Sequence, residues 1–302
     1  WSVFVDKVHT RDSTGLDWNK RAEGQSTRAI SFTKLTGLWA TWAIIAAVYC
    51  IARWYWEGNY LFAMQILGVA IVPMVVLSVP YILWLDRRMV QPLDGAWHFG
   101  AFLLAREPWD REKIIGHWRA WIIKGFFGAF MISILPGGFT QVVNADFGLL
   151  ASQPGALASA LIALLFVIDV QIGTVGYITT MRPLDSHIRS GNPFLAGWLA
   201  ALLCYPPVNY GLMSAGGLLD YEINAPGWQH WLAGNSMLLS LWGGWMVVLT
   251  AVYAWATVAF GLRFSNLTYR GVITNGPYRF TRHPAYVAKN LFWWSASLPF
   301  LV

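Results

Sequence analysis

The chain of 302 residues alternates long apolar runs with short polar segments. A helix needs about 20 predominantly apolar residues to cross a bilayer. Seven runs meet or approach this length, and Pro206-Pro207 makes the fifth the weakest. The pattern therefore predicts an all-α polytopic membrane helix bundle with seven transmembrane helices. Its expected spans are residues 35–55, 60–85, 118–135, 156–181, 194–212, 232–262 and 284 onward.

Basic residues fall on alternate sides of these runs. Of the 21 Lys and Arg, 19 lie in residues 1–34, 86–119, 182–189 and 263–289. Cytoplasmic loops carry such an excess, so the pattern predicts a cytoplasmic N-terminus. If the weak fifth run did not cross, the last basic cluster would lie on the opposite side of the membrane. The charge pattern therefore favours seven crossings.

Composition agrees with a membrane location. Only 12% of residues are charged, against about 25% in soluble domains, and there are 19 Trp, a residue enriched at membrane interfaces. The net charge is +6, and the basic residues lie between apolar runs and not in a separate basic domain. This distribution argues against nucleic-acid binding. The two cysteines, Cys50 and Cys204, lie inside apolar runs and lack disulfide-framework or zinc-site spacing.

Three regions follow from these patterns. Residues 1–34 form a polar cytoplasmic arm without a signal peptide, expected to lie along the membrane surface or to be partly disordered. Residues 35–261 form the bundle, with an interfacial amphipathic segment at 86–117 and a Gly-rich loop at 136–155. Residues 262–302 carry the informative motif. Because the chain begins at Trp1 and stops within an apolar run, we expect both ends to be incomplete.

The motif combines a turn, two arginines and a helix start. Asn275-Gly276-Pro277 is a turn signal, and His283-Pro284 suits the first turn of a helix. The N-terminus of that helix presents free N–H groups and a partial positive charge, which suit an anion. Arg279 and Arg282 add two positive charges beside it. The sequence therefore predicts an anion pocket where the last helix begins.

The same helix carries aromatic and polar groups at helical spacing. Tyr286, Asn290, Trp293 and Ser297 are three or four residues apart, so they share one face. A ligand with a carboxylate at one end and a cation further along would match this arrangement. S-adenosylmethionine is such a ligand, because an aromatic face stabilises a desolvated cation by ~2 kcal/mol. The residue types also fit other anions, including lipid head groups.

Gly276-Pro277-Tyr278-Arg279, followed by Arg282-His283-Pro284-Ala285-Tyr286, resembles the signature of the isoprenylcysteine carboxyl methyltransferase-like membrane family. The resemblance covers about 262–302. It implies S-adenosylmethionine bound on the cytoplasmic side and a lipophilic acceptor that arrives from the bilayer. It also implies that His283, Pro284 and Tyr286 line the cofactor site, with Tyr278, Arg279 and Arg282 beside it and Asn290 on the same helix face. Family members usually continue into a further hydrophobic segment and a Glu-containing tail, which this chain lacks.

Two further residues are candidates for substrate contact. Asp169 lies inside the fourth apolar run, and an intramembrane carboxylate is a functional candidate by default. It could equally pair with Gln171, Thr174 or a hydroxyl on another helix. Trp293 lies on the motif helix. The loop of residues 182–189 either closes over a cofactor or serves only as a topogenic loop.

Four histidines outside the motif share no metal-ligand spacing: His98, His117, His187 and His230. We expect no metal site.

The sequence therefore favours an integral membrane methyltransferase that moves a methyl group from S-adenosylmethionine to a lipid or lipophilic acceptor. Its catalytic residues are not identified, since no strong general base stands out. The membrane would be an inner, plasma or endomembrane, with the cofactor site on the cytoplasmic side. One alternative is a non-catalytic subunit of a larger membrane complex, built on a methyltransferase-like scaffold. Another is a sterol-reductase-like enzyme using NADPH, although such proteins typically carry Asn where Ala285 stands.

Overall fold

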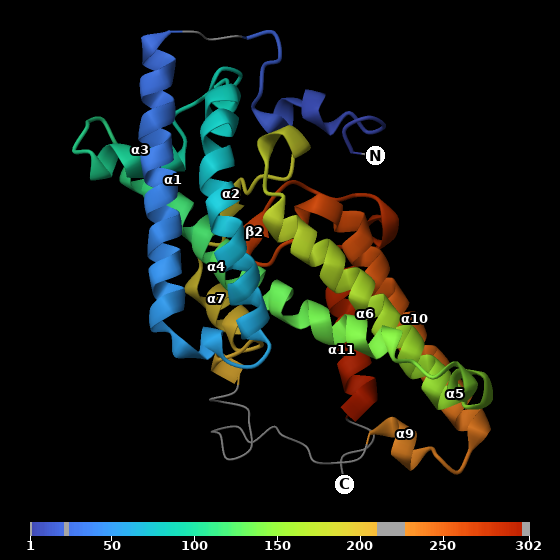
Figure 1. Cartoon of the computed structure of the whole chain (residues 1–302). Coiled ribbons are helices and arrows are strands. Elements are labelled where there is room, and N and C mark those ends of the chain that lie inside the picture. The colour runs from blue at the N-terminus through green and yellow to red at the C-terminus, as the bar shows by residue number, and fades with distance from the viewer. Residues whose placement is uncertain (1, 21–23, 210–226, 298–302) are drawn as a thin grey trace. The chain divides into compact units, whose positions relative to one another are not determined.

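The computed structural model describes residues 2–20, 24–209 and 227–297, and these fold into α-helices with one small sheet (Figure 1). Five helices are long and apolar enough to cross a membrane: α1 (Gln25–Ile51), α2 (Tyr60–Asp86), α4 (Arg111–Val143), α6 (Pro154–Ile178) and α10 (Ser236–Phe260). A helix of 25 residues is about 37 Å long, which exceeds the ~30 Å hydrocarbon core. The chain is therefore an integral membrane protein with five candidate spans among the described residues.

The surface of α2 shows why this helix needs lipid around it. Val69, Val72 and Val76 are all exposed, although they lie in the middle of the helix. In water such a row of apolar side chains would be unfavourable, whereas in a bilayer it meets acyl chains. Pro73 and Pro80 lie inside α2 without ending it, as membrane helices tolerate.

Helix α4 corrects the prediction that the third apolar run ends at Pro136. It continues through this proline to Val143, and α5 (Phe147–Ser152) lies in the remaining part of the expected Gly-rich loop. Thr140 Oγ1 donates to the Pro136 carbonyl oxygen at 2.9 Å, which adds a side-chain hydrogen bond to the helical turn that follows the proline. Proline removes one backbone hydrogen bond, and the apolar residues on both sides keep the helix intact in spite of that loss.

Two of the seven predicted spans are not confirmed. In the fifth run, α7 (Leu195–Leu202) has 8 residues and ends before Pro206-Pro207, while residues 210–212 lie outside the described residues. In the last run, α11 (Pro284–Ser297) has 14 residues, and residues 298–302 lie outside the described part. Because orientation was inferred from seven crossings, the cytoplasmic N-terminus stays a prediction.

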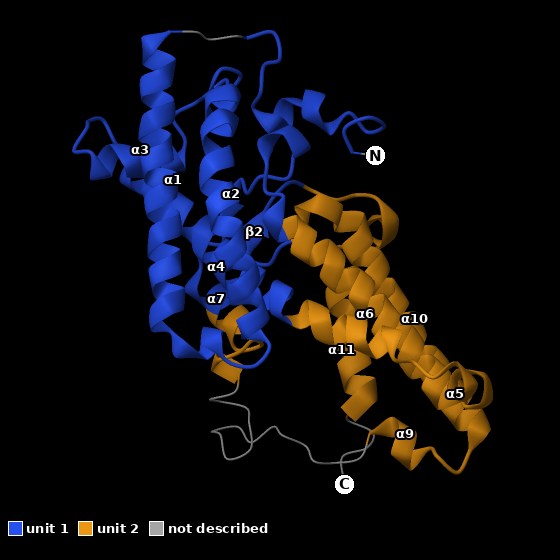
Figure 2. Cartoon of the chain, in the orientation of Figure 1, with its two compact units in different colours: residues 1–133, 177–198, 265–271 blue, residues 134–176, 199–264, 272–302 orange. Residues whose placement is uncertain are grey.

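The chain divides into two compact units (Figure 2). Unit 1 comprises residues 1–133, 177–198 and 265–271, and unit 2 comprises residues 134–176, 199–264 and 272–302.

Unit 1 contains α1, α2, α3 (Gly95–Leu103), the first part of α4 and the polar arm, whose short 3-10 helices are η1 (Val8–Thr10) and η2 (Asp12–Thr14). It also holds η3 (Arg53–Trp56) and η4 (Arg182–Leu184). A two-stranded antiparallel sheet pairs β1 (Ser190–Gly191) with β2 (Thr268–Tyr269), so that Ser190 faces Tyr269. Strands of two residues are too short to leave a periodic pattern, which is why the sequence analysis did not predict them.

Two glycines allow α1 and α3 to cross closely in unit 1. A Cβ atom added to Gly37 would lie 2.0 Å from the Ala96 carbonyl oxygen, and one added to Gly100 would lie 1.9 Å from the Thr33 carbonyl oxygen. Both obstacles are backbone atoms, which cannot move away as a flexible side chain can. Close backbone approach at small residues is typical of membrane helix packing. The amphipathic segment predicted at 86–117 thus contains a helix, α3, that packs directly on α1.

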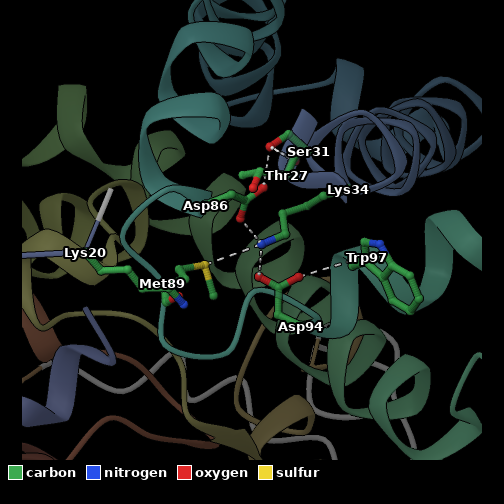
Figure 3. A network of polar contacts seen from close by, with 8 residues as sticks. All are labelled: Lys20, Thr27, Ser31, Lys34, Asp86, Met89, Asp94 and Trp97. Carbon is green, nitrogen blue, oxygen red and sulfur yellow. Dashed lines mark hydrogen bonds and ion pairs between the residues drawn. The ribbon is translucent and has the colours of Figure 1, made fainter. Parts of the chain in front are cut away.

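A buried polar network joins α1, α2 and the segment before α3 (Figure 3). The Lys34 ammonium lies 2.5 Å from Asp86 Oδ1 and 3.0 Å from Asp94 Oδ2. Ser31 Oγ donates to the second oxygen of Asp86 at 2.8 Å. Lys34 is 1% exposed and Asp86 2% exposed, so the pair is removed from water. Lys34, the last residue of the predicted polar arm, is thus a buried member of α1.

Unit 2 is a bundle of α6, α10 and α11 with an apolar centre. Met246, Leu249 and Phe292 form its buried core, and Phe166 packs against them from α6. Trp245 Nε1 donates to Ser295 Oγ at 3.0 Å, which ties α10 to α11. The unit also contains α9 (Trp228–Trp231), η5 (Gly261–Arg263) and η6 (Gly276–Arg279).

Candidate functional site

The first half of the motif forms a tight turn against α10. Gly276 begins η6, as the turn signal predicted, with a φ of +56° that favours glycine. Space demands glycine as well, because an added Cβ would lie 2.9 Å from Ala259 Cβ. The Tyr278 ring then packs edge-on against Phe260, with ring centroids 4.9 Å apart. Burial raises the pKa of this tyrosine hydroxyl above its ordinary value. The turn is therefore anchored to the end of α10 and holds Arg279 in a defined place.

The second half of the motif begins α11 at Pro284, which confirms the predicted helix start. The first turn of a helix leaves backbone N–H groups without intrahelical partners. Three side chains of the motif lie just before this end in the chain and are all exposed: Arg279, Arg282 and His283.

Two of these three side chains contact aromatic rings. The Arg279 guanidinium lies 4.6 Å from the Phe280 ring centroid, and the His283 ring lies 6.1 Å from that of Tyr286. Among the described residues, none of the three makes a side-chain hydrogen bond or ion pair. Their donors are available to an anion.

The exposed face of α11 continues from this end. Tyr286, Asn290 and Trp293 are all exposed, whereas Ala288 and Phe292 on the opposite side are buried. These three side chains therefore share one exposed side of α11, whereas Ser297 near its end is half-buried. In the described part of the chain this face is open and not enclosed, so the motif residues form a surface that a ligand can reach.

Asp169 lies in a buried polar cluster of unit 2. It is 4% exposed, and Thr257 Oγ1 donates to its Oδ1 at 2.5 Å. The Tyr253 hydroxyl also hydrogen-bonds this carboxyl group. Lys289 of α11 interacts electrostatically with Asp169, and its ammonium lies 5.8 Å from the Tyr253 ring centroid. The cluster thus connects α6, α10 and the motif helix.

Of the partners considered for Asp169, the hydroxyls on another helix are the ones that the structure shows. Thr174 instead donates to the Val170 carbonyl oxygen at 2.7 Å. The sequence analysis did not identify Tyr253 or Lys289. A signal was present for the second: Lys289 is the only lysine after residue 124, and a buried carboxylate favours a nearby cation.

This cluster makes a testable prediction about stability. Asp169→Ala removes the acceptor of two hydroxyls and is expected to lower the free energy of unfolding by about 2–4 kcal/mol. Asp169→Asn keeps an acceptor oxygen and is expected to cost less than half as much. Unfolding in mixed micelles, followed by tryptophan fluorescence, measures both. Asp6→Ala, at an exposed aspartate, is the matched control. Equal stability of wild type and Asp169→Ala would contradict the cluster.

Two histidines that the sequence analysis examined for metal binding have packing roles in unit 1. His98 Nδ1 accepts from the Asp110 backbone N–H at 3.0 Å, and His117 Nε2 lies 2.8 Å from Thr41 Oγ1. Among the described residues, no group of three or more His, Cys, Asp or Glu could hold a metal ion.

Comparison of the chain with models of protein families, with curated proteins and with solved structures finds no match. The resemblance to isoprenylcysteine carboxyl methyltransferase-like proteins therefore rests on the motif residues.

Proposed function

We propose that the chain is an integral membrane methyltransferase that moves a methyl group from S-adenosylmethionine to a lipid or lipophilic acceptor. The observation that carries this proposal is the open end of α11. Arg279, Arg282 and His283 precede this helix N-terminus in the chain, and their exposed side chains make no hydrogen bond or ion pair among the described residues. If these side chains only stabilised the fold, we would expect them to bond to other groups of the protein. Groups left available at an ordered helix start suit a bound anion.

The residues of this end fit S-adenosylmethionine. A carboxylate accepts several hydrogen bonds from guanidinium groups, so Arg279 and Arg282 together would hold the cofactor's carboxylate. Tyr286 and Trp293 present aromatic rings along the same exposed face, where they would stabilise a sulfonium. The bound cofactor would supply a methyl group on a cationic sulfur. The protein would bind and orient it next to the acceptor, which in the best cases lowers a barrier by ~7–11 kcal/mol.

The surface of unit 2 supports a lipophilic acceptor. Trp255 and Val258 on α10 and Val287 and Trp294 on α11 are large apolar residues that are exposed. In a bilayer they would contact acyl chains, so an acceptor dissolved in the membrane could reach the motif helix without passing through water. A carboxylate acceptor would need no base, whereas an amine or hydroxyl would need one to take its proton.

Binding of S-adenosylmethionine to the full-length protein in detergent tests the proposal. Isothermal titration is expected to show binding that His283→Ala weakens roughly tenfold, as loss of one hydrogen bond of ~1.4 kcal/mol would. His230→Ala, at another exposed histidine of unit 2, is the matched control. No binding to the wild type would overturn the proposal and favour the non-catalytic subunit, and wild-type affinity in His283→Ala would exclude His283 from the site. Binding of NADPH instead would favour the reductase.

A further inference from the structure

A group of polar side chains in unit 2 connects the motif helix to the interior of the bundle. Lys289 of α11 lies between Tyr286 and Trp293 at helical spacing, so it borders the exposed face that these two residues share. Lys289 itself is half-buried. At the inner end of the group lies Asp169 of α6, which is 4% exposed. The methyltransferase proposal gives no role to Lys289 or to Asp169.

The Lys289 ammonium has hydrogen-bond donors that the described part of the chain does not use. It lies 5.8 Å from the Tyr253 ring centroid and interacts electrostatically with Asp169. It nevertheless forms no hydrogen bond or ion pair among the described residues. The Asp169 carboxylate accepts from the hydroxyls of Thr257 and Tyr253 instead. The N–H donors of Lys289 are therefore available to a ligand.

The Tyr253 hydroxyl has unused capacity of the opposite kind. Its hydrogen is donated to Asp169, so the oxygen keeps lone pairs that can accept a hydrogen bond from a ligand. Tyr253 also interacts electrostatically with Tyr286 on the exposed face of α11. The buried carboxylate is therefore connected, through one tyrosine, to the motif helix. Such a chain of groups can move a proton inward from a ligand to Asp169.

A free ammonium beside a proton acceptor favours a hydroxyl group as the ligand. A hydroxyl can donate to the Tyr253 oxygen and accept from Lys289 at the same time. The Lys289 charge would repel an alkylammonium. A carboxylate would have no proton to give to Tyr253 and would experience the negative charge of Asp169.

Among hydroxyls, the chemistry of the group favours a phenol. A phenol has a pKa of about 10, as the tyrosine side chain does, and a neighbouring cation favours its ionised form. An alkyl alcohol is far less acidic. The exposed rings of Tyr286 and Trp293 can also pack against an aromatic ligand.

We propose that Lys289 and Tyr253, together with Asp169, bind the hydroxyl of a lipophilic phenol. Tyr253 takes the proton of the phenol as its own proton moves to Asp169, and the Lys289 ammonium stabilises the phenolate that results. This inference rests on the proposed function and deepens it, because it names the class of methyl acceptor. A phenol loses its proton when its oxygen is methylated, whereas a carboxylate acceptor has no proton to lose.

Binding of a coloured phenol without S-adenosylmethionine tests this site. The full-length protein in detergent is titrated with a short-chain alkyl nitrophenol, whose ionised form absorbs visible light. The bound probe is expected to ionise at a lower pH than the probe in the same detergent without protein, because Lys289 favours the phenolate. An alkylphenol should displace the probe at a roughly tenfold lower concentration than an alkylamine or a fatty acid of the same chain length. An unchanged ionisation of the probe, or equal displacement by the fatty acid or the amine, would overturn the proposal.

Variants identify the groups that act on the probe. Lys289→Met keeps most of the side-chain volume and is expected to abolish the change in ionisation. Tyr253→Phe keeps the ring and is expected to weaken probe binding roughly tenfold, as loss of one hydrogen bond would, and it carries the test if Lys289→Met does not fold. Lys113→Met and Tyr269→Phe, at exposed residues of unit 1, are the matched controls and should behave as the wild type does. Wild-type ionisation of the probe in Lys289→Met, or wild-type affinity in Tyr253→Phe, would contradict the site.

Failure of this site can be distinguished from failure of the proposed function, because the probe titration contains no cofactor. Binding of S-adenosylmethionine without binding of the phenol would overturn the phenol site alone. Binding of the phenol with the expected ionisation, but no binding of S-adenosylmethionine, would support the phenol site and overturn the methyltransferase proposal.

Discussion

Lys34→Met is expected to lower the free energy of unfolding by about 3–5 kcal/mol, since it removes one partner of a buried ion pair. Lys34 contacts Asp86 at 2.5 Å and Asp94 at 3.0 Å, and its side chain is 2% exposed. Methionine keeps most of the volume of lysine, so the loss would come from the charge and not from a cavity. Without the ammonium, Asp86 would remain buried beside a second carboxylate. Unfolding in mixed micelles measures the effect.

Two further variants separate this pair from general effects of removing a lysine. Lys113→Met, at an exposed lysine of α4, is expected to change the free energy of unfolding by less than about 0.5 kcal/mol. The double variant Lys34→Met/Asp86→Leu removes both charges and is expected to recover at least half of the loss, because no buried carboxylate then remains at position 86. Equal stability of Lys34→Met and Lys113→Met would show that the network does not stabilise the fold.

The lysine network also explains where sequence reasoning about the first helix was wrong. The apolar run predicted a start at Leu35, whereas α1 begins at Gln25. Seven of its first ten residues are polar, and two of these, Ser31 and Lys34, contact Asp86 of α2. A hydrophobicity pattern cannot distinguish a polar helical turn that is paired in the protein from a polar loop.

The expected bounds of two membrane helices agree closely with the structure. The expected span 60–85 became α2 (Tyr60–Asp86), and 156–181 became α6 (Pro154–Ile178). Lipid-facing helices are determined mainly by length and composition, which a single sequence shows directly. The predicted helix end at Pro136 is wrong. A single proline did not end this helix, because the apolar residues on both sides of it keep the helix intact.

The candidate site was predictable only as far as it is local. The turn at Gly276 and the helix start at Pro284 depend on neighbouring residues, and both were identified. The pairing of Asp169 with Thr257 joins positions 88 residues apart, and Asp185 pairs with Arg11 of the distant polar arm. Such contacts depend on how the helices pack, which the residue pattern of a single chain does not contain.

The double variant Arg279→Gln/Arg282→Gln is expected to weaken S-adenosylmethionine binding at least a hundredfold. Each hydrogen bond to a charged group contributes about 1.5–3 kcal/mol, which is at least a tenfold change in affinity per arginine. Each single variant should therefore show at least a tenfold loss in isothermal titration. Both side chains are exposed and make no side-chain hydrogen bond or ion pair among the described residues, so stability should change by less than about 0.5 kcal/mol.

The salt dependence of the same titration provides a second readout. Raising the ionic strength screens exposed charges, so binding to the wild type should weaken with salt, and the double variant should lose most of that dependence. Arg28→Gln, at an exposed arginine of α1, is the matched control and should bind as the wild type does. If the double variant binds S-adenosylmethionine with wild-type affinity, the start of α11 is not the carboxylate site. The cofactor would then have to be held by residues outside the motif, and the resemblance of the motif to the methyltransferase-like family would no longer support a cofactor site there.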